Sequence, residues 1–142
     1  MNEHKYFALE ELVATGVKLK NIPEWKHLAN LDRLAGVLDR IREKYGKPIK
    51  VNSGFRSRAV NAAVGGASSS MHQLGLAADI CAASGSEKDN RAILSILEGM
   101  KDELDQVISY HVCPGVRSTA IRFIHVGLQP DGFALRGLVL CK

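Results

Sequence analysis

Two histidines and one aspartate of this chain have the types and the spacing of a metal-ligand set. His72 and Asp79 lie seven residues apart within the stretch 70–80, and His125 follows much later within 123–126. A hydrolytic zinc ion binds three nitrogen or oxygen ligands of the protein and leaves a fourth position for the water that it acidifies. The sequence therefore predicts one zinc site with His72, Asp79 and His125 as its ligands.

The neighbours of these residues indicate how the chain positions them. Asp79 and His125 each stand alone between two apolar residues, and side chains of a strand alternate between the two faces of a sheet. Each of two strands can therefore bury its apolar residues and point its ligand the other way. Gly75 lies between His72 and the first of these strands, and glycine permits the backbone of a tight turn. We expect a turn that folds His72 back over Asp79.

The remaining pattern predicts an α+β fold. Apolar residues recur every three or four positions over 28–45, which is typical of an amphipathic helix. A short helix is expected over 7–13, a helical turn over 60–64 and another helix after the S-x-x-D start at 86–89. Strands are expected over 48–53, 78–80, 104–110, 124–126 and, at an edge, 134–140. We expect a single domain over 1–142, with an antiparallel sheet that holds the metal site on one face and packs helices on the other.

The composition is that of an ordinary globular domain. The chain has 142 residues, 46% of them hydrophobic, and a net charge of +4, a mild cationic bias that suits any anionic polymer. Three cysteines without C-x-x-C spacing do not predict a disulfide framework. The sequence shows neither an apolar signal region nor a run long enough to cross a membrane. We expect a monomer without nucleic-acid or membrane partners, made in the cytoplasm without a signal peptide.

Arg56 and two serines are candidates for binding a substrate. Arg56 follows the strand predicted over 48–53, where a guanidinium can hold a carboxylate through two hydrogen bonds. A structural ion pair with Asp79 or another acid is the alternative reading of the same arginine. Ser70, which we expect to form a hydrogen bond near the ligand pair, and Ser53 complete the predicted substrate-binding set.

Four motifs together resemble a known family. They are Asn-Ser-Gly-Phe-Arg-Ser at 52–57, Val-Gly-Gly-Ala at 64–67, the S-x-H-x-x-G-x-A-x-D pattern from Ser70 to Asp79, and Ile-His-Val at 124–126. This combination resembles the zinc-dependent M15 peptidases, which comprise D-alanyl-D-alanine carboxypeptidases and phage or bacterial endolysins with a hedgehog-like fold. The resemblance implies hydrolysis of peptide bonds in peptidoglycan stem peptides, by a D,D-carboxypeptidase or an endolysin-type endopeptidase. It also implies that Arg56 fixes the substrate peptide, and that another factor releases or exports the protein to the cell wall.

The proton-transfer group is where the chain departs from the family. The resemblance implies a Glu or Asp three residues before the last histidine ligand or at the end of the preceding strand, and these positions hold Arg122 and Tyr110. Arg122 stays protonated and cannot act as a base, whereas Tyr110 can donate a hydrogen bond to an oxyanion. Histidine is the usual side chain for proton transfer near neutral pH, which makes the neighbouring His111 a candidate. The catalytic candidates are therefore Tyr110 and His111, followed by Asp105 and then Asp131.

Other interpretations follow from particular residues. Without a competent base, the chain is a catalytically degenerate zinc-binding, cell-wall-binding domain, as some hedgehog-like domains are thought to be. A nucleic-acid-binding domain is supported by net charge alone. Cys81 shares a strand face with Asp79, so its thiolate can join the ligands, although we expect a small buried side chain. Trp25 is either a platform for a wall ligand or, as we expect, a residue that packs in the interior.

Overall fold

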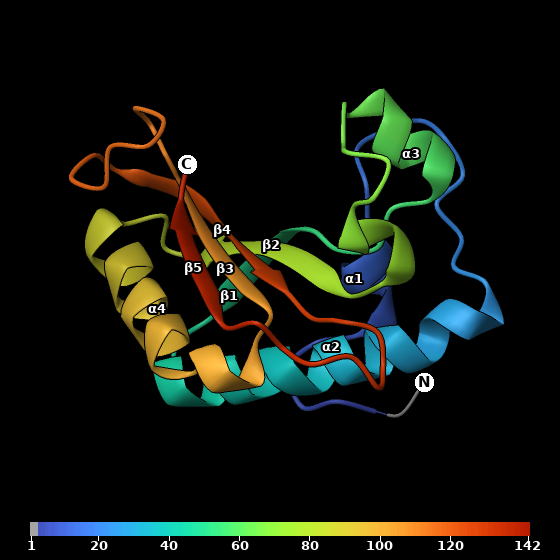
Figure 1. The fold of residues 1–142 in the computed structure, drawn as a ribbon, viewed down its shortest axis with the longest axis horizontal. Coiled ribbons are helices and arrows are strands. Elements are labelled where there is room, and N and C mark those ends of the chain that lie inside the picture. The colour runs from blue at the N-terminus through green and yellow to red at the C-terminus, as the bar shows by residue number, and fades with distance from the viewer. Residues whose placement is uncertain (1–2) are drawn as a thin grey trace.

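The helices and strands follow one another as in Figure 1, a ribbon view of the computed structural model, which describes residues 3–142. The helices are α1 (Leu9–Val13), α2 (Trp25–Tyr45), α3 (Arg58–Ala63) and α4 (Glu87–Gly99), with short 3-10 helices η1 (Met71–Leu74) and η2 (Lys101–Glu103). The strands are β1 (Ile49–Ser53), β2 (Ala77–Ala82), β3 (Gln106–His111), β4 (Ile121–Gly127) and β5 (Leu138–Cys141).

The five strands form one sheet in the order β1-β2-β4-β3-β5. The pairs β1–β2, β2–β4 and β3–β4 are antiparallel, whereas β5 pairs with β3 in parallel. The predicted α+β fold is confirmed, with one correction to the sheet. The edge strand begins at Leu138 and runs parallel to its neighbour, because the chain crosses the end of the sheet in the loop between β4 and β5 before it turns back.

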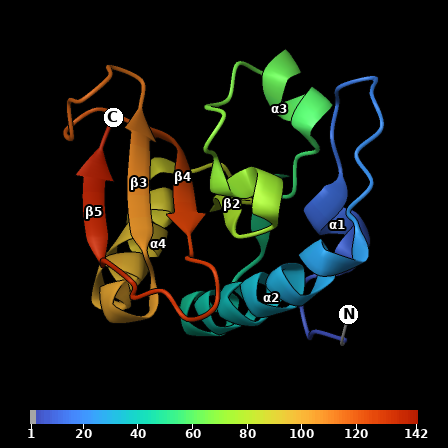
Figure 2. The ribbon, with the colours of Figure 1, turned by 45° about the vertical axis from the view of Figure 1, so that its right-hand side comes forward.

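Helices α2 and α4 lie on the same side of the sheet and cover one of its faces (Figure 2). The core between them contains the apolar residues that flank the ligands, Ala78 and Ile80 of β2 and Ile124 and Val126 of β4, all 0% exposed. From α2 it receives Leu31, Leu34, Leu38 and Ile41. Burial of these alternating residues fixes which face each strand turns to the helices. The polar residues between them, Asp79 and His125, therefore point to the opposite face.

The start of α2 differs from the sequence-based expectation. The helix begins at Trp25, because the Glu24 side chain accepts from the backbone N–H of His27, while the His27 ring accepts from that of Glu24. At this first helical position Trp25 is 85% exposed. The prediction that Trp25 packs in the interior is wrong. Within residues 3–142, no helix combines the length and the apolar character needed to cross a membrane.

Candidate metal centre

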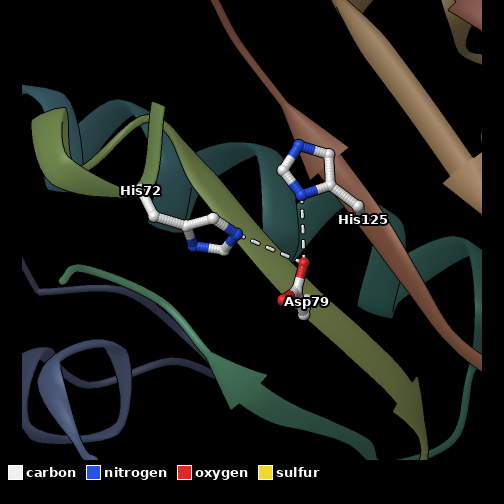
Figure 3. A group of neighbouring side chains, drawn as sticks. All are labelled: His72, Asp79 and His125. Atoms are coloured by element: carbon white, nitrogen blue, oxygen red, sulfur yellow. Dashed lines mark hydrogen bonds and ion pairs between the residues drawn. The ribbon is translucent and has the colours of Figure 1, made fainter. Parts of the chain in front are cut away.

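The three predicted ligands meet on the sheet face opposite α2 and α4. One oxygen of Asp79, Oδ1, lies 3.0 Å from Nδ1 of His125 and 3.3 Å from Nε2 of His72. Figure 3 shows both imidazole rings directed at this one carboxylate oxygen. The candidate ligand atoms all lie within 4.8 Å of one another. This group can hold a metal ion.

Strand register and a short turn bring the three residues together. Asp79 and His125 are directly paired across the antiparallel strands β2 and β4, so they are neighbours on one face. His72 comes from η1, whose first backbone turn is capped by the Ser70 hydroxyl, which accepts from the N–H of His72. Gly75 then adopts a left-handed backbone (φ 75°) that turns the chain into β2. The expected turn over Asp79 is present.

The atoms of the cluster that face one another are arranged to bind a cation. Nδ1 of His72 donates to the carbonyl of Gly54 at 2.8 Å, because a carbonyl oxygen can only accept. Nε2 of a neutral His72 ring therefore turns a lone pair toward the negatively charged oxygen of Asp79. Two acceptors face each other in this way only when a proton or a metal ion lies between them. Metal-binding histidines commonly hold their second nitrogen in such a carbonyl contact.

Asp79 is ionised in this arrangement. Its side chain is nearly buried, and burial by itself raises the pKa of the carboxyl. When the ring nitrogens of His125 and His72 that face Asp79 carry protons, their hydrogen bonds and their charge outweigh burial and hold the pKa of Asp79 well below its ordinary value. Arg56 adds an ion pair, with its Nη2 3.3 Å from Oδ2. The carboxylate is thus a permanent negative charge at the centre of the cluster.

Arg56 is held in place by the segment around it. Its Nε donates to the Ser53 hydroxyl at 3.0 Å and its Nη1 to the amide oxygen of Asn61 at 3.4 Å. Asn61 is buried, and its Nδ2 donates to the carbonyl of Ala67 at 2.9 Å. The ion pair between Arg56 and Asp79, which was the alternative interpretation of this arginine, is therefore present in the structure. Arg56 also lines the groove beside the metal cluster.

The cluster lies in an open groove of about 960 Å³, within the usual size of a ligand site. The segment 64–71 forms one wall, and the exposed sides of β3 and β4 form the other. Its cationic side chains are Arg56, Arg136 and Lys142, and its acidic side chain is that of Asp79. Arg56 is paired with Asp79 and Arg136 with Asp105, so the groove keeps only a small net positive charge.

A family model for peptidase M15 matches residues 5–126, most of the chain. The chain belongs to the peptidase M15 family. No curated protein matches it. Membership in this family indicates a hydrolase of peptide bonds. The matched region contains His72, Asp79 and His125, every element from α1 to β3, and all of β4 except its last residue.

Of the catalytic candidates of this M15 peptidase, Tyr110 lines the groove, whereas His111 and Asp105 do not. Tyr110 lines the groove and stacks on Phe123, with ring centroids 4.6 Å apart. Burial and the nearby charge of Asp79 raise the pKa of the Tyr110 hydroxyl, so it stays protonated at neutral pH and can donate a hydrogen bond. Arg122 does not line the groove; its guanidinium lies over the Phe123 ring.

His111 and Asp105 are not brought to the cluster. His111 is buried, with Nδ1 2.8 Å from the carbonyl of Thr119 and Nε2 2.9 Å from the hydroxyl of Ser109. It follows Tyr110 across a register shift in β3 and lies outside the groove. Asp105, also buried, accepts two hydrogen bonds from the guanidinium of Arg136, at 3.0 and 2.7 Å. Both side chains are used in structural contacts, so the structure offers neither of them as a base at the metal cluster.

Several groove residues were missed by sequence reasoning. Phe123 lies two positions before His125 on the same strand, so alternation alone indicates that it shares the groove face. The same alternation along β3 places Gln106 beside Tyr110 in the groove. No local signal points to Lys142, which the register of β5 delivers. Cys81 is half-buried, 3.6 Å from the amide nitrogen of Asn52, and it is not among the groups that can hold the metal.

Proposed function

We propose that the protein is a zinc-dependent peptidase that hydrolyses peptide bonds in peptidoglycan stem peptides, as a D,D-carboxypeptidase or an endolysin-type endopeptidase. The observation that carries the proposal is the convergence of two imidazole nitrogens and one carboxylate oxygen within 4.8 Å. This convergence lies in a groove of a peptidase-family chain. Three such ligands are the usual protein contribution to a catalytic zinc site.

His72, Asp79 and His125 would hold the ion. When bound in such a set, zinc supplies an activated water and polarises an amide carbonyl. The Gly54 carbonyl keeps the His72 ring in the tautomer whose Nε2 is free to bind. Arg56, anchored by Ser53 and Asp79, presents a fixed positive charge to a carboxylate of the peptide.

Tyr110 supports the developing negative charge in this proposal. It lines the groove two positions along β3 from Ile108, which is paired with the ligand His125. Its raised pKa keeps the hydroxyl proton available for donation to an oxyanion. Tyr110 therefore binds and orients the reacting amide, and we assign it no role as a base.

Binding without cleavage is the second candidate function. It is favoured by one observation, that among the described residues lining the groove the only acidic side chain is that of Asp79, itself a candidate ligand. A domain of this kind would hold zinc and the wall peptide but would lack a carboxylate to transfer the proton.

Metal analysis combined with product analysis tests the proposal. We expect purified protein to contain one zinc ion per chain and to convert soluble muropeptides into products whose masses identify the broken bond. His72→Ala should lose both the metal and the products. His4→Ala, which removes a histidine that contacts Asp32 instead, is the matched control and should keep both.

The outcomes separate the two candidate functions. One zinc ion per chain with no muropeptide cleavage would select the binding function. Cleavage by protein that contains no metal, or an unaltered metal content in His72→Ala, would refute the ligand assignment. With cleavage present, Tyr110→Phe should lower kcat by roughly 100- to 1,000-fold, the range for removal of one oxyanion donor, and should leave the zinc content unchanged.

A further inference from the structure

The metal groove has a cation at each of its two edges. Arg56 follows β1 at one edge of the sheet, and Lys142 follows β5 at the other. Both side chains line the groove. The strands β2 and β4, which carry Asp79 and His125, lie between these edges. A peptide that crosses the metal cluster from β5 toward β1 can therefore meet a cation on each side of it.

The backbone of Lys142 is fixed against β3. Its N–H donates to the carbonyl of Ser109 at 2.9 Å, and its carbonyl accepts from the N–H of His111 at 2.8 Å. These bonds continue the parallel pairing of β5 with β3, which Figure 2 shows side by side. Lys142 is thereby the neighbour of Tyr110 on the same sheet face, and both line the groove. The lysine stem thus starts from a defined point beside Tyr110.

Lys142 also differs from the other cations of the groove in its partners. Arg56 pairs with Asp79 at 3.3 Å, and Arg136 pairs with Asp105 at 2.7 Å. Among the residues that the structure describes, no aspartate or glutamate pairs with Lys142. The net positive charge of the groove is therefore located at Lys142. A carboxylate can bind there without displacing an existing ion pair.

The distance across the sheet determines which carboxylate Lys142 can reach. Neighbouring strands lie about 4.8 Å apart, and residues follow one another every 3.3 Å or so along a strand. Lys142 is two strands and two residues away from His125, since its neighbour Tyr110 lies two positions from Ile108, the partner of His125. The two Cα atoms are therefore about 12 Å apart. The lysine side chain covers part of this distance, and about two residues of an extended peptide cover the rest.

We infer that Lys142 is a specificity-determining residue, which binds a free carboxylate of the stem peptide about two residues from the cleaved bond. The protein then favours stem peptides in which this carboxyl group is free over those in which it is amidated. The inference rests on the proposed function, which supplies the peptide. An ammonium group attracts the charge of a carboxylate and donates a hydrogen bond to it, whereas an amide offers only a neutral oxygen. Because Lys142 lies away from the reacting amide, it acts on KM and not on kcat.

Two stem pentapeptides test this inference. Both contain diaminopimelate as the third residue, with its side-chain carboxyl group free in one and amidated in the other. In calorimetry with chelator-treated full-length protein, the free acid should bind about fivefold more tightly, the effect of one exposed ion pair. Lys142→Gln should abolish this preference, and Lys142→Arg should keep it. Salt at about 1 M should also abolish it, since the pair is exposed.

The matched control is Lys88→Gln, which removes the same charge from an exposed residue of α4 outside the groove. It should keep the preference. Lys142 is exposed as well, so both variants should match the wild type in urea unfolding. With zinc-containing protein, Lys142→Gln should lower kcat/KM on the free acid about fivefold through KM alone and leave the amidated peptide unaffected.

The possible results separate the two proposals. Equal binding of both peptides by the wild type, or a preference that survives in Lys142→Gln, would overturn the carboxylate site. Hydrolysis of both peptides with equal kcat/KM would refute this site and leave the proposed activity intact. A preference in calorimetry that depends on Lys142, without hydrolysis of either peptide, would support the site and refute the activity.

Discussion

Replacing Gly54 with alanine should disturb the metal site through the backbone. An added Cβ would lie 2.2 Å from the carbonyl oxygen of Leu12 in α1 and 3.0 Å from its carbonyl carbon. Backbone atoms cannot rotate out of the way, and the same Leu12 oxygen accepts from the N–H of Phe55 at 2.7 Å. Either α1 or Gly54 must move, and Gly54 is the residue whose carbonyl orients the ring of His72.

The size of the effect follows from these contacts. Overpacking of this kind costs about 1–3 kcal/mol, and loss of the Phe55–Leu12 hydrogen bond adds about 1 kcal/mol. The free energy of unfolding should therefore fall by about 2–4 kcal/mol. Displacing the Gly54 carbonyl should also weaken zinc binding roughly 10- to 100-fold, as substitutions behind a metal ligand do.

Two measurements test this chain of contacts. Urea unfolding of metal-free protein gives the stability, and competition with a chromophoric chelator gives the zinc affinity. Gly16→Ala is the matched control, because nothing lies within 4 Å of its added Cβ, and it should match the wild type in both measurements. Wild-type stability in Gly54→Ala would refute the close approach. Reduced stability with an unchanged zinc affinity would refute the link to His72.

Three further changes have separate expected outcomes. Gly36→Ala lies within α2, where the nearest atom to the added Cβ is 3.7 Å away; it should raise the urea-unfolding free energy by about 0.5–1 kcal/mol, and a decrease would contradict this. Asp105→Asn removes the charged partner of Arg136 and should lower the unfolding free energy at pH 7 by about 2 kcal/mol. Arg136 holds the pKa of Asp105 below its ordinary value. This stabilisation is therefore fully present at pH values above the ordinary pKa of an aspartate, and it is lost as the pH falls through the folded-state pKa. The difference between wild type and Asp105→Asn should therefore shrink below about pH 4, and a constant difference would show that the ion pair is not its source. Asn61→Ala frees Arg56 and the wall segment 64–70, so steady-state kinetics on muropeptides should show a larger increase in KM than decrease in kcat; an unchanged KM would argue against this positioning role.

Local pattern was sufficient to predict the framework of the site. Alternation around Asp79 and around His125 predicted which residues enter the core and, by exclusion, which face the groove. The apolar spacing over 28–45 predicted α2, and the glycine between His72 and β2 predicted the turn that carries η1. Each of these inferences depends on contacts between residues close in sequence, where periodicity determines direction.

Other features depend on partners far away in sequence. Tyr110 and His111 are adjacent, yet one lines the groove and the other is buried against Thr119. Asp105 appeared available for proton transfer, but it binds Arg136, 31 residues further along the chain. The exposure of Trp25 follows from its place as the first residue of α2, after the N-cap Glu24. An apolar side chain alone does not reveal that its position faces solvent.

By itself, the sequence determined the donor types, the alternating strands and the helical spacing, since these are properties of residues and their near neighbours. Tertiary structure alone decided that the donors share one carboxylate oxygen, that the Gly54 carbonyl holds the His72 ring, and that the sheet delivers Lys142 to the groove. Strand register and loop closure join segments remote in sequence, and the free energy that selects one register belongs to the whole core and not to any short stretch of residues.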